Sequence, residues 1–118
     1  MNDPLARKRA LIVEDEVLVA MLVEELLERM GYEVAAVSSH LEEALRIGRA
    51  ISVDFAILDI NLNGMQSFPV AEVLRDRGIP FIFATGYGDT MLNGAFAGVP
   101  VVQKPFSRDD LRAALAKL

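Results

Sequence analysis

Five short apolar runs alternate along the chain with stretches whose apolar residues recur every three or four positions. The runs cover residues 10–13, 33–37, 55–58, 81–84 and 99–102. Short runs with few polar residues are typical of strands that are buried on both faces of a parallel sheet. The stretches between them predict amphipathic helices over 17–30, 40–49 and 69–76, and a last helix follows Ser107.

Residues that start and stop helices support these boundaries. Gly31 ends the first helix, Pro69 suits the first turn of the third, and Ser107 caps the last. Ser39 and Glu42 form the pattern of a capping box for the second helix. The apolar face of the last helix is expected to carry Leu111, Ala114, Leu115 and Leu118.

The segment 86–98 is the weakest part of the pattern. It contains four glycines and little helical periodicity, so a helix between the fourth and fifth strands is expected to be weak.

Right-handed crossovers between the strands give a doubly wound α/β sheet with helices on both faces. The predicted fold is flavodoxin-like, with strand order 2-1-3-4-5, in a single domain over residues 1–118 of which residues 1–8 are frayed.

Composition narrows the function classes. Hydrophobic residues make up 53% and charged residues 25% of the chain, which suits a compact folded domain. The net charge of −5 argues against binding to nucleic acid or to anionic membranes. The absence of cysteine and the single histidine, His40, exclude thiolate chemistry and histidine metal clusters. No apolar run could span a membrane or serve as a signal peptide, so we expect a cytoplasmic protein.

Polar side chains suited to chemistry follow four of the five predicted strands. They are Glu14 and Asp15 after the first strand, Asp59 after the third, Thr85 after the fourth and Lys104 after the fifth. The carboxyl ends of parallel strands meet at one edge of a sheet, and in the order 2-1-3-4-5 these four strands are consecutive neighbours. We therefore expect three carboxylates, a hydroxyl and an ammonium to gather at that edge.

This set of groups suits phosphoryl transfer. Clustered carboxylates repel one another unless a cation lies among them. Lys104 offsets part of the charge, and Mg²⁺, a hard ion that takes oxygen ligands and pairs with phosphate oxygens, fits the rest best. Such a site can clamp a phosphoryl group with help from Lys104 and the Thr85 hydroxyl. The predicted step is in-line attack by Asp59 on phosphorus, which gives an acyl phosphate.

Each feature taken alone has a simpler structural explanation. The pair Glu14-Asp15 is typical of a solvated helix N-terminus, and a lone aspartate such as Asp59 is more often a cap or turn residue. Thr85-Gly86 alone is typical of a turn, and Lys104-Pro105 alone is typical of an exposed strand end. All four features are predicted at one edge of the sheet, and their side chains are chemically complementary. This combination favours the functional interpretation.

At these residues the sequence resembles the receiver domain of two-component response regulators, and the resemblance covers essentially the whole chain. It implies that Asp59 is the phosphoacceptor, Thr85 the switch hydroxyl and Lys104, in the motif K-P-F, the lysine of the active site. It also implies a cis peptide bond between Lys104 and Pro105. The predicted fold is the fold of this family.

The resemblance also implies a set of metal ligands. Asp15, Asp59 and the backbone carbonyl of Asn61 would bind Mg²⁺ directly, and Glu14 would act through water. Glu14 and Asp15 correspond to the acidic pair of the family. These residues make up the complete predicted metal site.

Two positions depart from the usual family pattern. Asn63 stands four residues after the acceptor, where a proline is usual, and Val101 stands three residues before the lysine, where an aromatic switch residue is usual. The motifs F-A-T-G-Y-G at 83–88 and D-I-N-L-N-G at 59–64 are similar to an atypical stand-alone subgroup in which the helix between strands four and five is short or mobile. We therefore expect the readout of phosphorylation to be ordering of residues 86–98, triggered through Thr85.

The function predicted from the sequence is a phosphorylatable single-domain response regulator. A sensor histidine kinase or a histidine phosphotransfer protein would supply the phosphoryl group to Asp59 with Mg²⁺. No output domain fits within 118 residues, so we expect output by protein contact through strand four, residues 86–98 and the last helix. The chain is expected to be a phosphoacceptor with intrinsic autodephosphorylation rather than an enzyme.

Three alternatives remain open from the sequence. The first is a pseudo-receiver that binds a partner without being phosphorylated, against which the complete set of site residues argues. The second is an aspartyl-phosphate phosphatase, which needs a second acid two residues after Asp59, where this chain has Asn61. The third, flavin binding, is suggested by fold analogy alone, since the chain has no phosphate-cradling loop.

Overall fold

A parallel sheet forms the centre of the molecule in the computed structural model, which describes residues 7–86 and 94–118. Its strands lie in the order β2–β1–β3–β6–β7, which confirms the predicted order 2-1-3-4-5. The strands are β1 (Arg9–Val13), β2 (Glu33–Ser38), β3 (Phe55–Asp59), β6 (Phe81–Thr85) and β7 (Val101–Gln103). All neighbouring pairs in this sheet are parallel.

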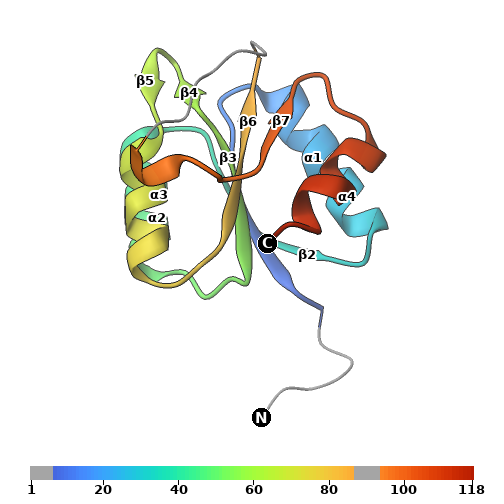
Figure 1. The fold of residues 1–118 in the computed structure, drawn as a ribbon, viewed down its shortest axis with the longest axis horizontal. Coiled ribbons are helices and arrows are strands. Elements are labelled where there is room, and N and C mark those ends of the chain that lie inside the picture. Colours follow the sequence, from blue (N-terminus) through green and yellow to red (C-terminus); the bar gives the residue numbers. More distant parts are fainter. Residues whose placement is uncertain (1–6, 87–93) are drawn as a thin grey trace.

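Two pairs of helices cover the two faces of the sheet (Figure 1). Helices α1 (Val17–Arg29) and α4 (Arg108–Leu115) lie on one face, and α2 (Leu41–Ala50) and α3 (Phe68–Asp76) lie on the other. Side chains alternate along a strand, so each strand contributes to both cores. In β1, for example, Leu11 packs with the α2–α3 side and Ile12 packs with the α1–α4 side.

The helix caps confirm one prediction and correct another. Ser107 caps α4 in a full capping box, because its hydroxyl accepts from the backbone N–H of Asp110 and its own N–H donates to the Asp110 carboxylate. The predicted capping box of Ser39 and Glu42 is wrong. Helix α2 begins one residue later than expected, with His40 as its N-cap and no side-chain cap.

The physical reason lies in the register of the first turn of α2. With His40 at the cap, the third helical residue is Glu43 rather than Glu42. Glu43 accepts a hydrogen bond of 2.8 Å from the hydroxyl of Ser38, at the end of β2. The hydroxyl of Ser39 instead lies 2.9 Å from Nδ1 of His40. The acid therefore fixes the end of the strand to the helix.

Two other expectations are corrected at the C-terminal end of the chain. Strand β7 begins at Val101 rather than at residue 99. Pro100 has no N–H that could donate to a neighbouring strand, and the N–H of Val99 donates instead to the carbonyl of Phe96. Leu118, predicted on the apolar face of the last helix, follows the end of α4 and is 45% exposed.

A short hairpin that the sequence pattern did not predict follows β3. It pairs β4 (Asn61–Leu62) with β5 (Met65–Gln66) in an antiparallel arrangement. Both turn residues have positive φ, 53° at Asn63 and 84° at Gly64. Asparagine followed by glycine is the commonest sequence for the tight hairpin turn that needs two such residues.

The connection from β6 to β7 is described only in part. Residues 94–98 contain one short 3₁₀ helix, Gly94–Phe96, which agrees with the expectation of a short helical element there. The predicted mobility concerns residues 86–98, of which 87–93 lie outside the described ranges, and the predicted fraying concerns residues 1–8, of which 1–6 lie outside them. Within 7–86 and 94–118, no helix has both the length and the apolar character needed to cross a bilayer.

Candidate functional site

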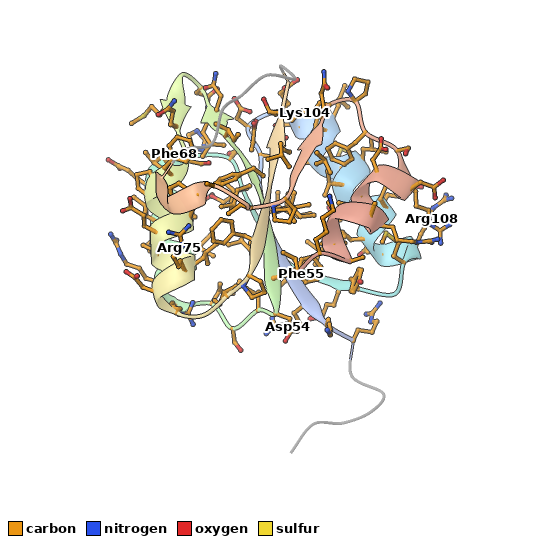
Figure 2. All side chains as sticks on the ribbon, viewed as in Figure 1. Asp54, Phe55, Phe68, Arg75, Lys104 and Arg108 are labelled. Atoms are coloured by element: carbon orange, nitrogen blue, oxygen red, sulfur yellow. The ribbon has the colours of Figure 1, made fainter. Side chains whose placement is uncertain are left out.

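The predicted site residues come together at the carboxyl edge of the sheet. Lys104 lies at this end in Figure 2, and Asp54 and Phe55 lie at the opposite end. Asp59 pairs in register with Ala84 of β6, one residue before Thr85. The cavity there has a volume of about 500 Å³. It is lined by Asp15, Glu16, Asp59, Ile60, Asn61, Asn63, Gly64, Gln66, Thr85, Gly86 and Lys104.

Three carboxylates converge beside this cavity. Glu14, Asp15 and Asp59 can each offer one oxygen such that these oxygens all lie within 4.8 Å of one another. Glu14 and Asp59 are buried, with 4% and 5% of their surfaces exposed, and Asp15 is half-buried. An all-oxygen donor set with a partly open side is the kind of site that Mg²⁺ prefers. The residues present therefore fit the predicted ion.

Lys104 is the cation of this cluster. Its Nζ lies 2.7 Å from Oε1 of Glu14 and 3.0 Å from Oδ2 of Asp59. A third carboxylate, that of Glu16, approaches the same ammonium at 3.6 Å. The backbone places the lysine at the end of β6, because its N–H donates to the carbonyl of Thr85 at 2.7 Å. Its peptide bond to Pro105 is cis, as the family resemblance implied.

The electrostatics of the cluster follow from burial. Desolvation raises the pKa of Glu14 to about 7, although its ion pair with Lys104 acts in the other direction. Desolvation also raises the pKa of Asp59, again against the hydrogen bond from Lys104. Burial tends to lower the pKa of Lys104, but the hydrogen bonds to Glu14 and Asp59 outweigh it and the pKa is raised. Without a further cation, the cluster holds its negative charge at a cost.

Asp15 differs from the two buried acids because of the hairpin. Burial tends to raise its pKa, but hydrogen bonds outweigh that effect and the pKa is lowered. The leading one comes from the backbone N–H of Asn63, which donates to Oδ2 of Asp15 at 2.9 Å. The hairpin itself is tied to the acceptor, since the N–H of Asn61 donates to Oδ1 of Asp59 at 3.3 Å.

Comparison with known proteins supports the family resemblance that these site residues carry. A family model described as the response regulator receiver domain matches residues 10–116. The chain belongs to this family. Its solved neighbours include the solution structure of SdrG from Sphingomonas melonis Fr1, which is 43% identical. That match covers 94% of this chain and 95% of SdrG, with a TM-score of 0.84.

Two further relatives extend the comparison. The receiver domain of the PhyR response regulator from Erythrobacter litoralis is 25% identical over 98% of this chain and 92% of that chain, with a TM-score of 0.83. A probable transcriptional regulator, ycf27 of Cyanophora paradoxa, is 32% identical over 95% of this chain and 48% of its own length. The chain thus spans about half the length of the curated relatives that it matches.

The structure explains one departure of this receiver domain from the usual family sequence. Proline has no N–H and fixes φ near −65°, whereas Asn63 donates its N–H to Asp15 and has a φ of +53°. The hairpin and the Asp15 contact therefore both require a residue other than proline here. Asn63 was identified from the sequence only as a deviation, and the Asn-Gly turn signal could have revealed its hairpin.

The second departure, Val101, is the exposed first residue of β7, with 40% of its surface accessible. Aromatic side chains gather elsewhere in this receiver domain. Phe96 stacks on Phe68 at a ring distance of 5.2 Å and meets Phe83 edge-on at 5.7 Å. Phe68 is the first residue of α3, two positions after the hairpin ends, and in Figure 2 it lies at the upper end of that helix. These rings join the start of α3 to the 94–98 segment.

All predicted site residues lie at this edge, and sequence reasoning missed one further charged residue of the cavity wall, Glu16. Glu14 is buried beneath the cavity in contact with Lys104, while Asp15, Asp59, Asn61, Thr85 and Lys104 line its wall. Glu16, the third acid of the run Glu14-Asp15-Glu16 in the sequence, also lines the wall and reaches Lys104. The acidic run was its only signal in the sequence.

Proposed function

We propose that this receiver domain is a phosphoacceptor in two-component signalling. Asp59 would take a phosphoryl group from the phosphohistidine of a sensor histidine kinase or of a histidine phosphotransfer protein. The observation that carries the proposal is the contact of Asp59 Oδ2 with Lys104 Nζ at 3.0 Å on the wall of a cavity that also holds Asp15. A nucleophile, a cation and metal-binding oxygens are thereby available to one incoming phosphoryl group.

The transfer step uses groups of this chain in distinct roles. A carboxylate oxygen of Asp59 forms a bond to phosphorus while the bond from phosphorus to the donor nitrogen breaks. That nitrogen keeps the electron pair, and the donor leaves as neutral imidazole when its other nitrogen carries a proton. Lys104 and the hydroxyl of Thr85 stabilise the negative charge of the phosphoryl oxygens during transfer.

A bound Mg²⁺ would supply further positive charge against the phosphoryl oxygens. The residues that would hold it are Asp15, Asp59 and the backbone carbonyl of Asn61, with Glu14 acting through water. The N–H of Asn63 donates to Oδ2 of Asp15 and so would orient this carboxylate within the metal site. Loss of the phosphoryl group to water would regenerate Asp59, so the chain is proposed to dephosphorylate itself rather than to turn over a substrate.

Output is proposed to pass to a downstream protein through the face of β6, the 86–98 segment and α4. Two observations support this face. Val101 is exposed at the edge of the sheet, and Phe96 stacks on Phe68, which ties residues 94–98 to the start of α3. A relative that is 43% identical, SdrG, has been solved in a BeF3-activated conformation. The activated conformation of this relative supports the proposal that the present chain can also be activated.

Intact-mass spectrometry tests the proposal directly. The protein is incubated with a small phosphodonor, with and without Mg²⁺, beside Asp59→Asn and a matched control, Asp76→Asn, which lies exposed at the end of α3. One phosphate adduct that needs Mg²⁺, persists in Asp76→Asn and is lost in Asp59→Asn is expected. No adduct in the unmodified chain would favour a pseudo-receiver, and an adduct that survives in Asp59→Asn would mean that another residue is the acceptor.

A further inference from the structure

Glu16 occupies a position that helix formation alone does not explain. It is the N-cap residue of α1, yet its side chain makes no capping hydrogen bond. Its backbone is held instead, because its N–H donates to Oε2 of Glu14 at 3.1 Å. The side chain remains 65% exposed and extends along the cavity wall to within 3.6 Å of Nζ of Lys104.

Glu16 therefore adds a fourth carboxylate to a site that already contains three. Among the described residues that line the cavity, Lys104 is the only base. The hairpin side of the cavity is neutral, since Asn61, Asn63, Gly64 and Gln66 form it. The charge that an incoming donor meets is thus set by Asp15, Asp59 and Glu16 against one lysine. Of these acids only Glu16 lies outside the predicted metal and acceptor set.

We propose that Glu16 determines which phosphodonors the site accepts, by selecting against donors with more negative charge. The inference rests on the proposed phosphoacceptor function and specifies the donor class for that same site. Favoured donors have a nitrogen leaving group that is protonated, as in phosphoramidate or a phosphohistidine. Disfavoured donors, such as acetyl phosphate, carry one more negative charge at neutral pH and release an anion.

The two donors react by the same displacement with different charge balance. With phosphoramidate, an Asp59 oxygen bonds to phosphorus, the phosphorus–nitrogen bond breaks, and the protonated nitrogen takes the electron pair and leaves as ammonia. With acetyl phosphate, the phosphorus–oxygen bond breaks, and acetate leaves with the electron pair. Only the second reaction brings a dianion into the cavity and releases an anion past Glu16.

The expected size of the effect follows from Coulomb's law. One additional unit of charge at a separation of about 6 Å changes a rate about threefold at the dielectric constant of water and about tenfold at half that value. Because Glu16 is exposed, added salt should screen the effect. Glu16→Gln is therefore expected to raise the rate ratio of acetyl phosphate to phosphoramidate by about three- to tenfold in dilute buffer.

The experiment measures phosphorylation rates with both donors in the unmodified chain, in Glu16→Gln and in Glu28→Gln. Glu28 lies on the same helix but about 18 Å further along it, so this control makes the same substitution far from the cavity. The concentration of Mg²⁺ is raised for each protein until the phosphorylation rate no longer changes, so that differences in metal affinity do not affect the comparison. The ratio should change in Glu16→Gln, shrink towards the unmodified value with added potassium chloride, and remain constant in Glu28→Gln.

The outcomes separate this inference from the function on which it rests. If the unmodified chain is phosphorylated by both donors and the ratio in Glu16→Gln equals that of the control, the inference is wrong and the phosphoacceptor function stands. If both rates change by the same factor, Glu16 acts on the structure of the site and not on donor charge, and the inference is again wrong. If neither donor phosphorylates the unmodified chain, the proposed function and the inference are both overturned.

Discussion

Raising the pH in the absence of divalent ions should destabilise this receiver domain, because the folded state binds protons at the site more tightly than the unfolded chain does. Glu14 has a pKa of about 7 in the fold against 4.5 in its absence. A group whose pKa is raised on folding contributes stability that is complete below the unfolded value and is lost as pH rises through the folded value. The loss should therefore fall between about pH 4.5 and pH 7.

The magnitude follows from the size of this shift. Each pKa unit corresponds to about 1.4 kcal/mol, so Glu14 alone accounts for about 3 kcal/mol of lost unfolding free energy. Asp59, whose pKa is also raised, adds to the loss with the same sign. Asp15 and Lys104 do not contribute in this range, because the pKa of Asp15 is lowered from 3.8 and that of Lys104 is raised from 10.5. Bound Mg²⁺ should restore stability at high pH by binding only the folded state.

Urea unfolding followed by far-ultraviolet circular dichroism at pH 5, 6, 7 and 8 in a chelator measures the effect without needing tryptophan, which the chain lacks. Glu14→Gln should reduce the loss, and the double variant with Asp59→Asn should be flat across the range. Glu28→Gln, on the exposed side of α1, should retain the full loss. The reasoning is refuted if the unmodified chain is equally stable at pH 5 and pH 8 in chelator, or if the double variant keeps the slope.

Three other substitutions test parts of the structure in turn. Ser67→Ala should leave stability unchanged or raise it, because the buried Ser67 hydroxyl has no hydrogen-bond partner among the residues that the structure describes. Ser107→Ala, by contrast, should cost about 1 kcal/mol through loss of its capping box, and urea unfolding compares the two variants. Asn63→Pro should weaken Mg²⁺ binding at least about tenfold by removing a hydrogen bond to the Asp15 carboxylate, and Asn63→Gly, which keeps the N–H and tolerates positive φ, should bind nearly normally; calorimetric titration distinguishes them, and equal affinities would contradict the assigned contact. Phe96→Ala should cost about 3–5 kcal/mol in unfolding free energy by emptying the aromatic cluster, and a loss under about 1 kcal/mol would contradict the packing described.

The order of the strands and the gathering of the site residues could be predicted from the sequence because both depend on where apolar runs end. A run that stops at a polar residue places that residue at the strand terminus, and parallel pairing then brings such termini together. Asp59 ends β3 and Thr85 ends β6 in this way. No knowledge of side-chain conformations is needed for that inference.

What the sequence did not reveal depends on contacts between distant segments. The position of Glu16 on the cavity wall depends on where Lys104 lies in space, and the two are far apart in the chain. The start of α2 was misplaced by one residue because Ser38, at the end of the preceding strand, bonds Glu43 and so competes with the local capping pattern. Strand β7 begins two residues later than the apolar pattern predicts, because Pro100 within that run cannot donate to the ladder.

The hydrogen bond from Asn63 to Asp15 has a consequence for how this sequence can change over time. A proline at position 63 must give up both the positive φ of the hairpin and the donor that holds the Asp15 carboxylate. A lineage can therefore exchange the two residues only after its site has found another way to orient the acid. The order of substitutions is therefore constrained. Proline, the more usual residue at this position, cannot be reached by a single substitution at position 63. The residue at position 63 and the orientation of the Asp15 carboxylate are thus constrained to change together.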